Sequence, residues 1–262
     1  MRAALTALLL AALGALAAGC AAPPAPAQEI RTASDMTDAD RRARLRMELA
    51  AGYFGRGQMT TALDEVKQAL AARPDLPEAY NLRGLIYASL GQPELAEESF
   101  QRALQLAPRD ADTMHNYGWF LCQQQRFDAA AVQFDRAVQQ PQYRGVARTL
   151  LAKGVCEARS GQLPAAERTL TRSYELDPAN PATAFSLGEV LFQLKEYERV
   201  RFYLRRLNAQ PATANAQTLW LAARVEQRLG NAAGMRELGD QLRQRFPDSR
   251  EALSFERGQF DE

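Results

Sequence analysis

Three cysteines and one histidine are the residues of this sequence whose chemistry most needs an explanation. Cys20 follows an apolar N-terminal run, whereas Cys122 and Cys156 lie 34 residues apart in stretches with helical periodicity. Paired cysteines serve as redox sites, metal ligands or structural disulfides. His115 is the only histidine, so a site with several histidine ligands is excluded. The elements that carry these four side chains decide which chemistry applies.

Catalytic motifs are missing from the chain. It contains no Gly-rich phosphate loop, no His-Glu-x-x-His, no Gly-x-Ser-x-Gly and no Cys-x-x-Cys. His115 is therefore predicted to be an ordinary groove or core residue. Lys and Arg total 32 against 31 Asp and Glu, so the chain lacks the excess positive charge that is typical of nucleic-acid-binding proteins. The sequence predicts no enzyme, no metal or cofactor, and neither a nucleic-acid partner nor a small-molecule substrate.

The first 19 residues are predicted to be a lipoprotein signal peptide. One basic residue, Arg2, precedes an uncharged run that is shorter than the roughly 20 residues of a membrane-spanning helix. The run ends in "LAAGC", and small residues directly before a cysteine resemble the bacterial lipobox, although Ala17 stands where that motif favours Leu. Cys20 would then be the lipidated mature N-terminus, and Ala21 after it resembles lipoproteins sent to the outer membrane. The alternative is a plain secretory signal with an incidental cysteine.

Residues 20–40 are predicted to be the lipidated cysteine followed by a flexible tether. The segment "AAPPAPAQEIRTASDMTDAD" is rich in Ala, Pro and small polar residues and has few large apolar ones. Such a composition cannot bury a core. The segment would space the folded body from a membrane.

From residue 41 to residue 262 the chain repeats itself at intervals of 34 to 36 residues. Each unit has two helical stretches joined by a short turn, and a proline follows the second stretch. The sequence predicts six helix hairpins that start near residues 43, 77, 111, 147, 181 and 216. One column of small residues marks where the two helices of each hairpin cross: Ala50, Gly84, Gly118, Gly154, Gly188 and Ala223.

The second unit, "EAYNLRGLIYASLGQPELAEESFQRALQLAPRD", resembles the tetratricopeptide repeat closely. The residues at the expected intervals are Tyr80, Gly84, Tyr87, Gly91, Ala96, Phe100, Ala103 and Pro108. The resemblance implies an all-α fold, a tetratricopeptide-repeat superhelix of six helix hairpins. In such an array the first helix of each pair lines an inner groove.

The repeat alignment predicts how the side chains of the two remaining cysteines are oriented toward each other. Cys156 aligns with Phe120, so it is offset by two residues from the position of Cys122. Two residues turn a helix by about 200° and advance it by about 3 Å, which points the two side chains toward each other on neighbouring parallel helices. In an exported protein we therefore predict a structural disulfide, with two free buried thiols as the alternative. The closed loop would stabilise the fold by about 4 kcal/mol in the chain-entropy model.

A more particular resemblance covers nearly the whole chain. "NYGWFLC" in the third repeat, two extra residues around "PQYRGVA", "GVC" in the fourth repeat and "QRFPDS" near the C-terminus are similar to the type IV pilus biogenesis and stability family, PilF or PilW. The resemblance implies a pilotin: an outer-membrane lipoprotein on the periplasmic face that binds secretin subunits and helps them assemble. It also implies roles in pilus stability and twitching motility.

Two other functions stay open at this level. One is a lipid-anchored adaptor for outer-membrane barrel assembly or for peptidoglycan enzymes. The other is an enzyme with an unrecognised site, which has little support because no acid, base and nucleophile converge.

The partner is expected to bind along the first helices, where residues three and four apart share a face. Trp119 is the leading candidate, flanked by Leu85 and Val155, although each such residue could instead pack against a neighbouring repeat. Should this face not bind, the basic stretch "ERVRFYLRR" offers Arg201, Arg205 and Arg206. The predicted first-helix face consists of Met47, Phe54, Leu85, His115, Trp119, Leu151, Val155, Phe185 and Phe192.

Overall fold

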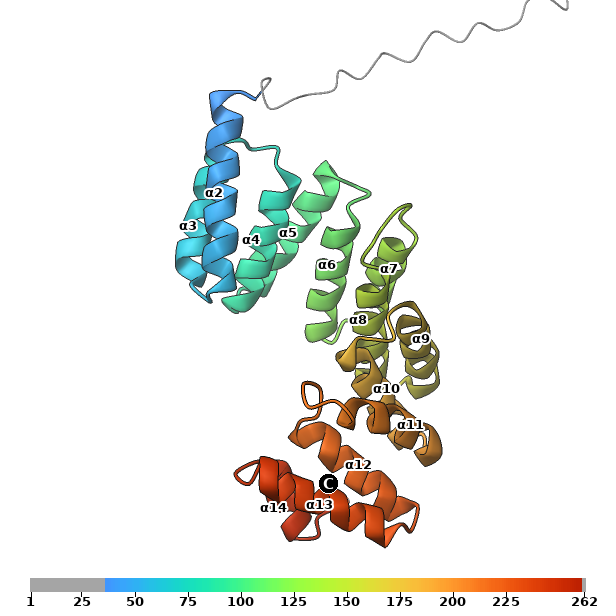
Figure 1. Ribbon diagram of the computed structural model, residues 1–262. Coiled ribbons are helices and arrows are strands. Elements are labelled where there is room, and N and C mark those ends of the chain that lie inside the picture. Colours follow the sequence, from blue (N-terminus) through green and yellow to red (C-terminus); the bar gives the residue numbers. More distant parts are fainter. Residues whose placement is uncertain (1–35, 261–262) are drawn as a thin grey trace, which may run out of the picture. The chain divides into compact units, whose positions relative to one another are not determined.

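The computed structural model describes residues 36–260, in which every regular element is a helix (Figure 1). The described part holds thirteen helices, and the predicted all-α array of six hairpins is confirmed. The helices are α2 (Asp38–Gly55), α3 (Met59–Ala72), α4 (Pro77–Ser89), α5 (Pro93–Leu106), α6 (Ala111–Gln123), α7 (Phe127–Val138), α8 (Val146–Arg159), α9 (Leu163–Leu176), α10 (Pro181–Gln193), α11 (Tyr197–Asn208), α12 (Ala216–Arg228), α13 (Ala232–Arg245) and α14 (Arg250–Glu256).

The fold divides into two compact units between Arg41 and Arg42. Of the first unit the structure describes only residues 36–41, in which Thr37 and Asp40 cap the start of α2 by reciprocal hydrogen bonds. Helix α2 begins at Asp38, within the last residues that we assigned to the tether. The predicted signal peptide, Cys20 and most of the tether lie outside the described residues. None of the described helices has the length and apolar character needed to cross a membrane.

The turn inside each hairpin needs a backbone conformation that most residues avoid. One residue per turn has a positive φ angle, between 59° and 80°, which glycine adopts without steric cost. Four of the six turns use glycine, and Gln125 and Lys195 occupy the other two. The prolines that follow the second helices all lie beyond a helix end, where a missing N–H breaks no helical hydrogen bond.

Small residues on the first helix let a large side chain of the second helix reach the backbone. A Cβ atom built on Gly84 would lie 2.8 Å from the ring of Phe100, and one on Gly118 would lie 2.9 Å from the ring of Phe134. Both rings are fully buried. The first helices of successive repeats also contact each other, α4 with α6, α6 with α8, α8 with α10 and α10 with α12. Hairpin and repeat contacts therefore form one continuous packed array within residues 42–260.

In the last hairpin, the space that a large side chain of the second helix fills in other repeats is filled by a side chain from outside the repeat. Gly239 in α13 aligns with Leu204 in α11, so the hairpin lacks its own large residue at this place. Phe255 of α14 lies directly over Gly239 and fills the space. Ser249 begins α14 by accepting the backbone N–H of Ala252 at 3.1 Å. Helix α14 was not predicted from the sequence, although Pro247 followed by Ser249 is a helix-start signal.

Candidate partner-binding site

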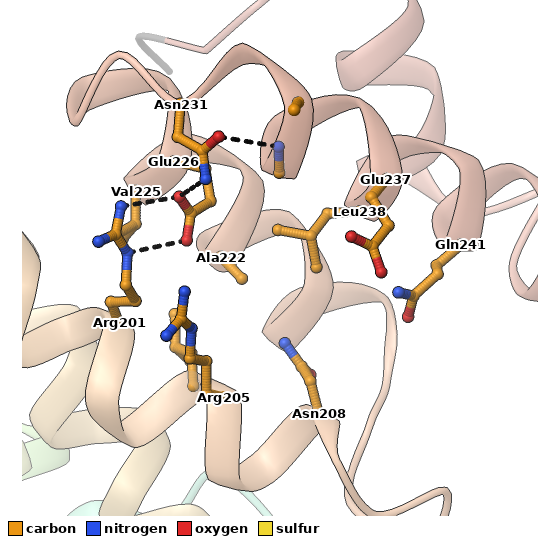
Figure 2. A pocket seen from close by; sticks show the side chains of 13 residues that line it. Arg201, Arg205, Asn208, Ala222, Val225, Glu226, Asn231, Glu237, Leu238 and Gln241 are labelled. Carbon is orange, nitrogen blue, oxygen red and sulfur yellow. Dashed lines mark hydrogen bonds and ion pairs between the residues drawn. The ribbon is translucent and has the colours of Figure 1, made fainter.

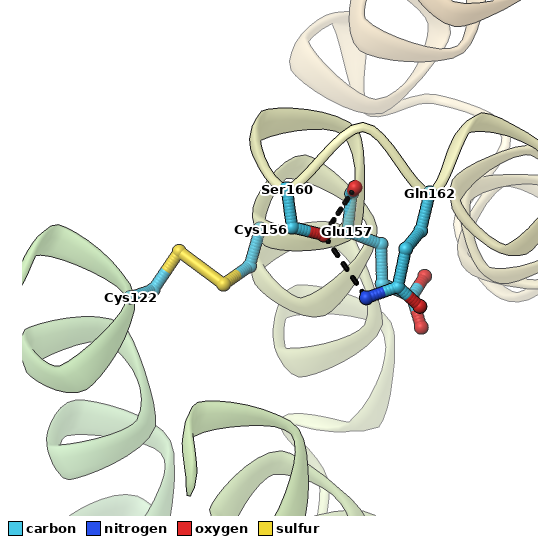
Figure 3. Close-up of a disulfide and its surroundings, with 5 residues drawn as sticks. All are labelled: Cys122, Cys156, Glu157, Ser160 and Gln162. Carbon is cyan, nitrogen blue, oxygen red and sulfur yellow. Dashed lines mark hydrogen bonds between the residues drawn. A yellow bond between two sulfur atoms is a disulfide. The ribbon is translucent and has the colours of Figure 1, made fainter. Parts of the chain in front are cut away.

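Cys122 and Cys156 form a disulfide between the first helices of the third and fourth repeats (Figure 3). Their Cα atoms are 5.8 Å apart, and both residues are buried in an aromatic cluster that contains Phe100 and Phe134. The pairing predicted from the repeat offset is confirmed. Because the bond joins α6 to α8, and not the two helices of one hairpin, it fixes one repeat against the next.

His115 forms a second link between the same two helices. Its Nδ1 atom is 2.9 Å from the hydroxyl oxygen of Thr149, and the hydroxyl of Tyr143 is also 2.9 Å from that oxygen. Burial, with a smaller contribution from the positive charge of Arg148, lowers the pKa of His115 to about 4. The imidazole is therefore neutral at neutral pH and makes a structural hydrogen bond. Tyr143 belongs to the two-residue insertion, so the insertion supplies part of this link.

All nine residues of the predicted first-helix face are half-buried, so each both packs against protein and keeps contact with solvent. Met47 and Phe54 pack on the core of the first repeats around Ala50. Leu85 and Trp119 each pack on the aromatic cluster that holds the disulfide. Exposed apolar area beside a rigid core is typical of surfaces that bind a partner chain.

The rest of the face belongs to a separate apolar cluster. Leu151, Phe185 and Phe192 pack on the core of the fourth and fifth repeats. Val155 lines a hollow of about 280 Å³ between α8 and α10, together with polar residues such as Glu189. Partial desolvation raises the pKa of Glu189. The structure thus divides the predicted face into patches on different clusters.

Arg201, Arg205 and Arg206, the three α11 arginines named as the alternative surface, have different surroundings. Arg201 forms a two-point ion pair with the buried carboxylate of Glu226, at 2.9 and 2.8 Å. Arg206 lies near the hydroxyl of Tyr174, at 3.4 Å. Arg205 lines a cavity of about 520 Å³ among α11, α12 and α13. This cavity was not predicted from the sequence. Some of the side chains beside it are smaller than their counterparts in the preceding repeat.

Stacked helix hairpins with a half-exposed apolar face on their first helices define a tetratricopeptide-repeat protein. Family models for the tetratricopeptide repeat match residues 77–110, 121–181 and 151–207. The crystal structure of PilW, described as a widely conserved type IV pilus biogenesis factor, is 30% identical and has a TM-score of 0.74. That comparison covers 81% of this chain and 97% of PilW. The chain belongs to the PilF/PilW family of type IV pilus assembly proteins.

A second relative agrees with this assignment. The type IV pilus assembly protein PilF of Pseudomonas aeruginosa is 27% identical over 210 residues, which cover 80% of this chain and 83% of PilF. A solved structure of Pseudomonas aeruginosa PilF has a TM-score of 0.74 at 26% identity, covering 85% of this chain and all of that one. The similarity therefore extends over most of the length of both relatives.

Proposed function

We propose that this chain is a pilotin, a lipoprotein of the outer membrane that binds type IV pilus secretin subunits on the periplasmic face. It would bring the subunits to the membrane and promote their multimerisation, and so support pilus biogenesis and stability. The observation that carries the proposal is the similarity to PilF and PilW over most of their length. The lipobox that ends at Cys20 supports the anchor.

The half-buried first-helix face is the proposed surface for the secretin segment. Its patches are apolar and aromatic, which suits an amphipathic helix or an extended apolar segment better than a charged tail. Trp119 and Leu85 share one of these patches, and the disulfide lies in the core beneath it. A rigid base lowers the entropy lost when a partner binds.

Deleting the gene tests the proposal at the level of the cell. Secretin multimers in the outer-membrane fraction and pili on the surface should both be lost, and a plasmid copy of the gene should restore them. Affinity capture from solubilised membranes should recover secretin. Recovery of barrel-assembly or peptidoglycan proteins without secretin would instead favour the general adaptor.

The double change Trp119→Ala and Leu85→Ala tests the surface itself. Secretin binding should weaken by about 2 kcal/mol or more, roughly thirtyfold, if these side chains are an interface hot spot. Phe202→Ala is the matched control, because Phe202 is an aromatic residue on α11 that is 61% exposed and lies outside the face. Circular dichroism should show that all variants fold. Unchanged binding by the folded double variant would contradict the assignment of this surface.

A further inference from the structure

A cavity that the sequence did not predict lies among the second helix of the fifth repeat and both helices of the sixth (Figure 2). It measures about 520 Å³, which is more than one side chain fills. Its apolar floor includes Leu204, Ala222, Val225 and Leu238. Polar side chains surround the floor, so the cavity has the composition of a ligand site, with an apolar base and a few polar groups.

The equivalent place one repeat earlier is filled by large side chains. Arg199 of α11 forms an ion pair with Glu167 of α9 at 2.6 Å. Tyr203 of α11 packs edge-on against Tyr174 of α9, with 5.0 Å between ring centroids. These two contacts narrow the gap between the second helices of the fourth and fifth repeats, where a smaller hollow of about 110 Å³ remains beside Tyr174 and Tyr203.

The repeat alignment shows smaller residues at the same place in the next pair. Gly234 occupies the position of Arg199, and Leu238 occupies the position of Tyr203. On the facing helix, Asn208 of α11 occupies the position of Tyr174 of α9. The larger cavity therefore coincides with the substitution of three large side chains by smaller ones.

The charged groups of the lining differ in whether they already have hydrogen-bond or ion-pair partners within the chain. Glu226 accepts two hydrogen bonds from Arg201 and one from Asn231, at 2.7 Å (Figure 2). Arg205 lies on the same helix as Arg201, and no ion pair joins it to any residue between 36 and 260. Its guanidinium is thus a donor group at the cavity with no anionic partner in the described part of the chain.

Two amide groups add further hydrogen-bond donors to the lining of the cavity. The Nδ2 atom of Asn208 donates one hydrogen to the carbonyl oxygen of Thr218 at 3.2 Å, which leaves its second hydrogen available. Gln241 presents its amide from α13, on the opposite wall (Figure 2). Glu237 lies beside Gln241, so the negative group of the rim is on the side away from Arg205 (Figure 2).

We propose that this cavity binds an acidic side chain of a partner protein, with its carboxylate at Arg205 and a neighbouring apolar residue on the floor. The lining has two guanidinium groups and two carboxylates, so its formal charge is balanced. A carboxylate with a single charge suits such a site better than a phosphate dianion, which both Glu226 and Glu237 would repel. The proposal does not depend on secretin being the partner, because any protein with an exposed acidic and apolar segment offers this chemistry.

A peptide titration of the purified, ¹⁵N-labelled protein tests the site. The probe is acetyl-Leu-Asp-Val-amide, whose only carboxylate is the side chain of Asp, and the control is acetyl-Leu-Asn-Val-amide. The Asp peptide should shift the side-chain NMR signals of Arg205 and Asn208 and bind at least about fivefold more tightly than the Asn peptide. Inorganic phosphate at equal concentration should not displace it.

Removing the charge of Arg205 and removing that of Glu237 should change the affinity for the Asp peptide in opposite directions. Arg205→Ala should weaken the Asp peptide about fivefold, whereas Glu237→Gln should strengthen it about twofold. Arg206→Ala is the matched control, since it removes the same charge from the same helix without lining the cavity. Leu238→Tyr restores the aromatic side chain of the preceding repeat and should block the site.

The proposal is overturned if the two peptides bind equally, if neither binds, or if Arg205→Ala in a folded protein leaves the affinity unchanged. Signal shifts confined to the first-helix face would also overturn it. None of these results bears on secretin assembly, which is measured in cells with the gene deletion, so the two proposals fail separately.

Discussion

Replacing Gly118 by alanine tests whether the small-residue column sets the distance between the helices of a hairpin. The added Cβ would lie 2.9 Å from two ring atoms of Phe134, closer than such atoms approach in folded proteins. Phe134 is fully buried and packs edge-on against His115, with 6.1 Å between ring centroids. The ring must therefore shift within the buried core to admit the added atom.

The size of the effect follows from two opposing contributions. Alanine is favoured over glycine inside a helix by about 1 kcal/mol. Overpacking of a closed core costs about 1 to 3 kcal/mol. Gly118→Ala should therefore lower the free energy of unfolding by up to about 2 kcal/mol.

Gly188 is the matched control, because it occupies the same column two repeats later without the close contact. A Cβ atom there would meet its nearest neighbour, Val200, at 3.7 Å, an ordinary van der Waals distance. Gly188→Ala should raise the free energy of unfolding by about 1 kcal/mol. Urea unfolding of both variants measures the difference, expected at about 1 to 3 kcal/mol. Equal effects at the two positions would refute the crossing argument.

The first repeat suggests a compensating change. It pairs Ala50 with Val66 at the positions of Gly118 and Phe134, and both of its residues are fully buried. The double variant Gly118→Ala with Phe134→Val should therefore be more stable than the sum of the single effects, by about 1 kcal/mol in a double-mutant cycle. Additive effects would mean that Gly118→Ala does not destabilise the protein through its contact with Phe134.

Three further outcomes are expected. Replacing both Cys122 and Cys156 by serine should lower the free energy of unfolding by about 4 kcal/mol, seen as a lower melting temperature, and mass spectrometry of the native, non-reduced protein should find neither thiol free. The pKa of His115 is lowered from 6.5 to about 4, so the unfolded chain takes up the proton first as pH falls. The free energy of unfolding should thus fall between those two pH values, by about 3 kcal/mol, and His115→Gln should lose less over the same range in urea titrations. Cys20→Ser should release the protein from the outer-membrane fraction, and retention with an unmodified N-terminus would contradict lipidation.

Local, repeated signals explain how much of the fold could be predicted from sequence. The helix crossings at Gly84 and Gly118, the glycine turns and the terminating prolines each depend on a few neighbouring residues, so periodicity reveals them. The disulfide was also predictable, because the offset between Cys122 and Cys156 can be read from the repeat alignment. Phe255 was not, since it fills the place of a missing residue from a helix outside the repeat.

The candidate sites were less accessible to sequence reasoning. A helical-wheel face indicates which residues share a side, and all nine residues are indeed half-exposed. It does not indicate that they divide among separate clusters. The cavity beside Arg205 coincides with three smaller side chains in two helices, so it becomes visible only when adjacent repeats are compared position by position. Tyr143 in the insertion contacts Thr149 through tertiary packing, which no periodic signal encodes.

The bond between Cys122 and Cys156 also limits how far the chain can be drawn out by force. When the ends of the array are pulled apart, tension passes through the two sulfur atoms and bypasses the chain between them, which contains all of α7. The 34-residue span would remain outside the stretched path and remove about 115 Å from the contour length. A reducing agent would release this hidden length, so the oxidised protein is a shorter and stiffer tether than its sequence length implies.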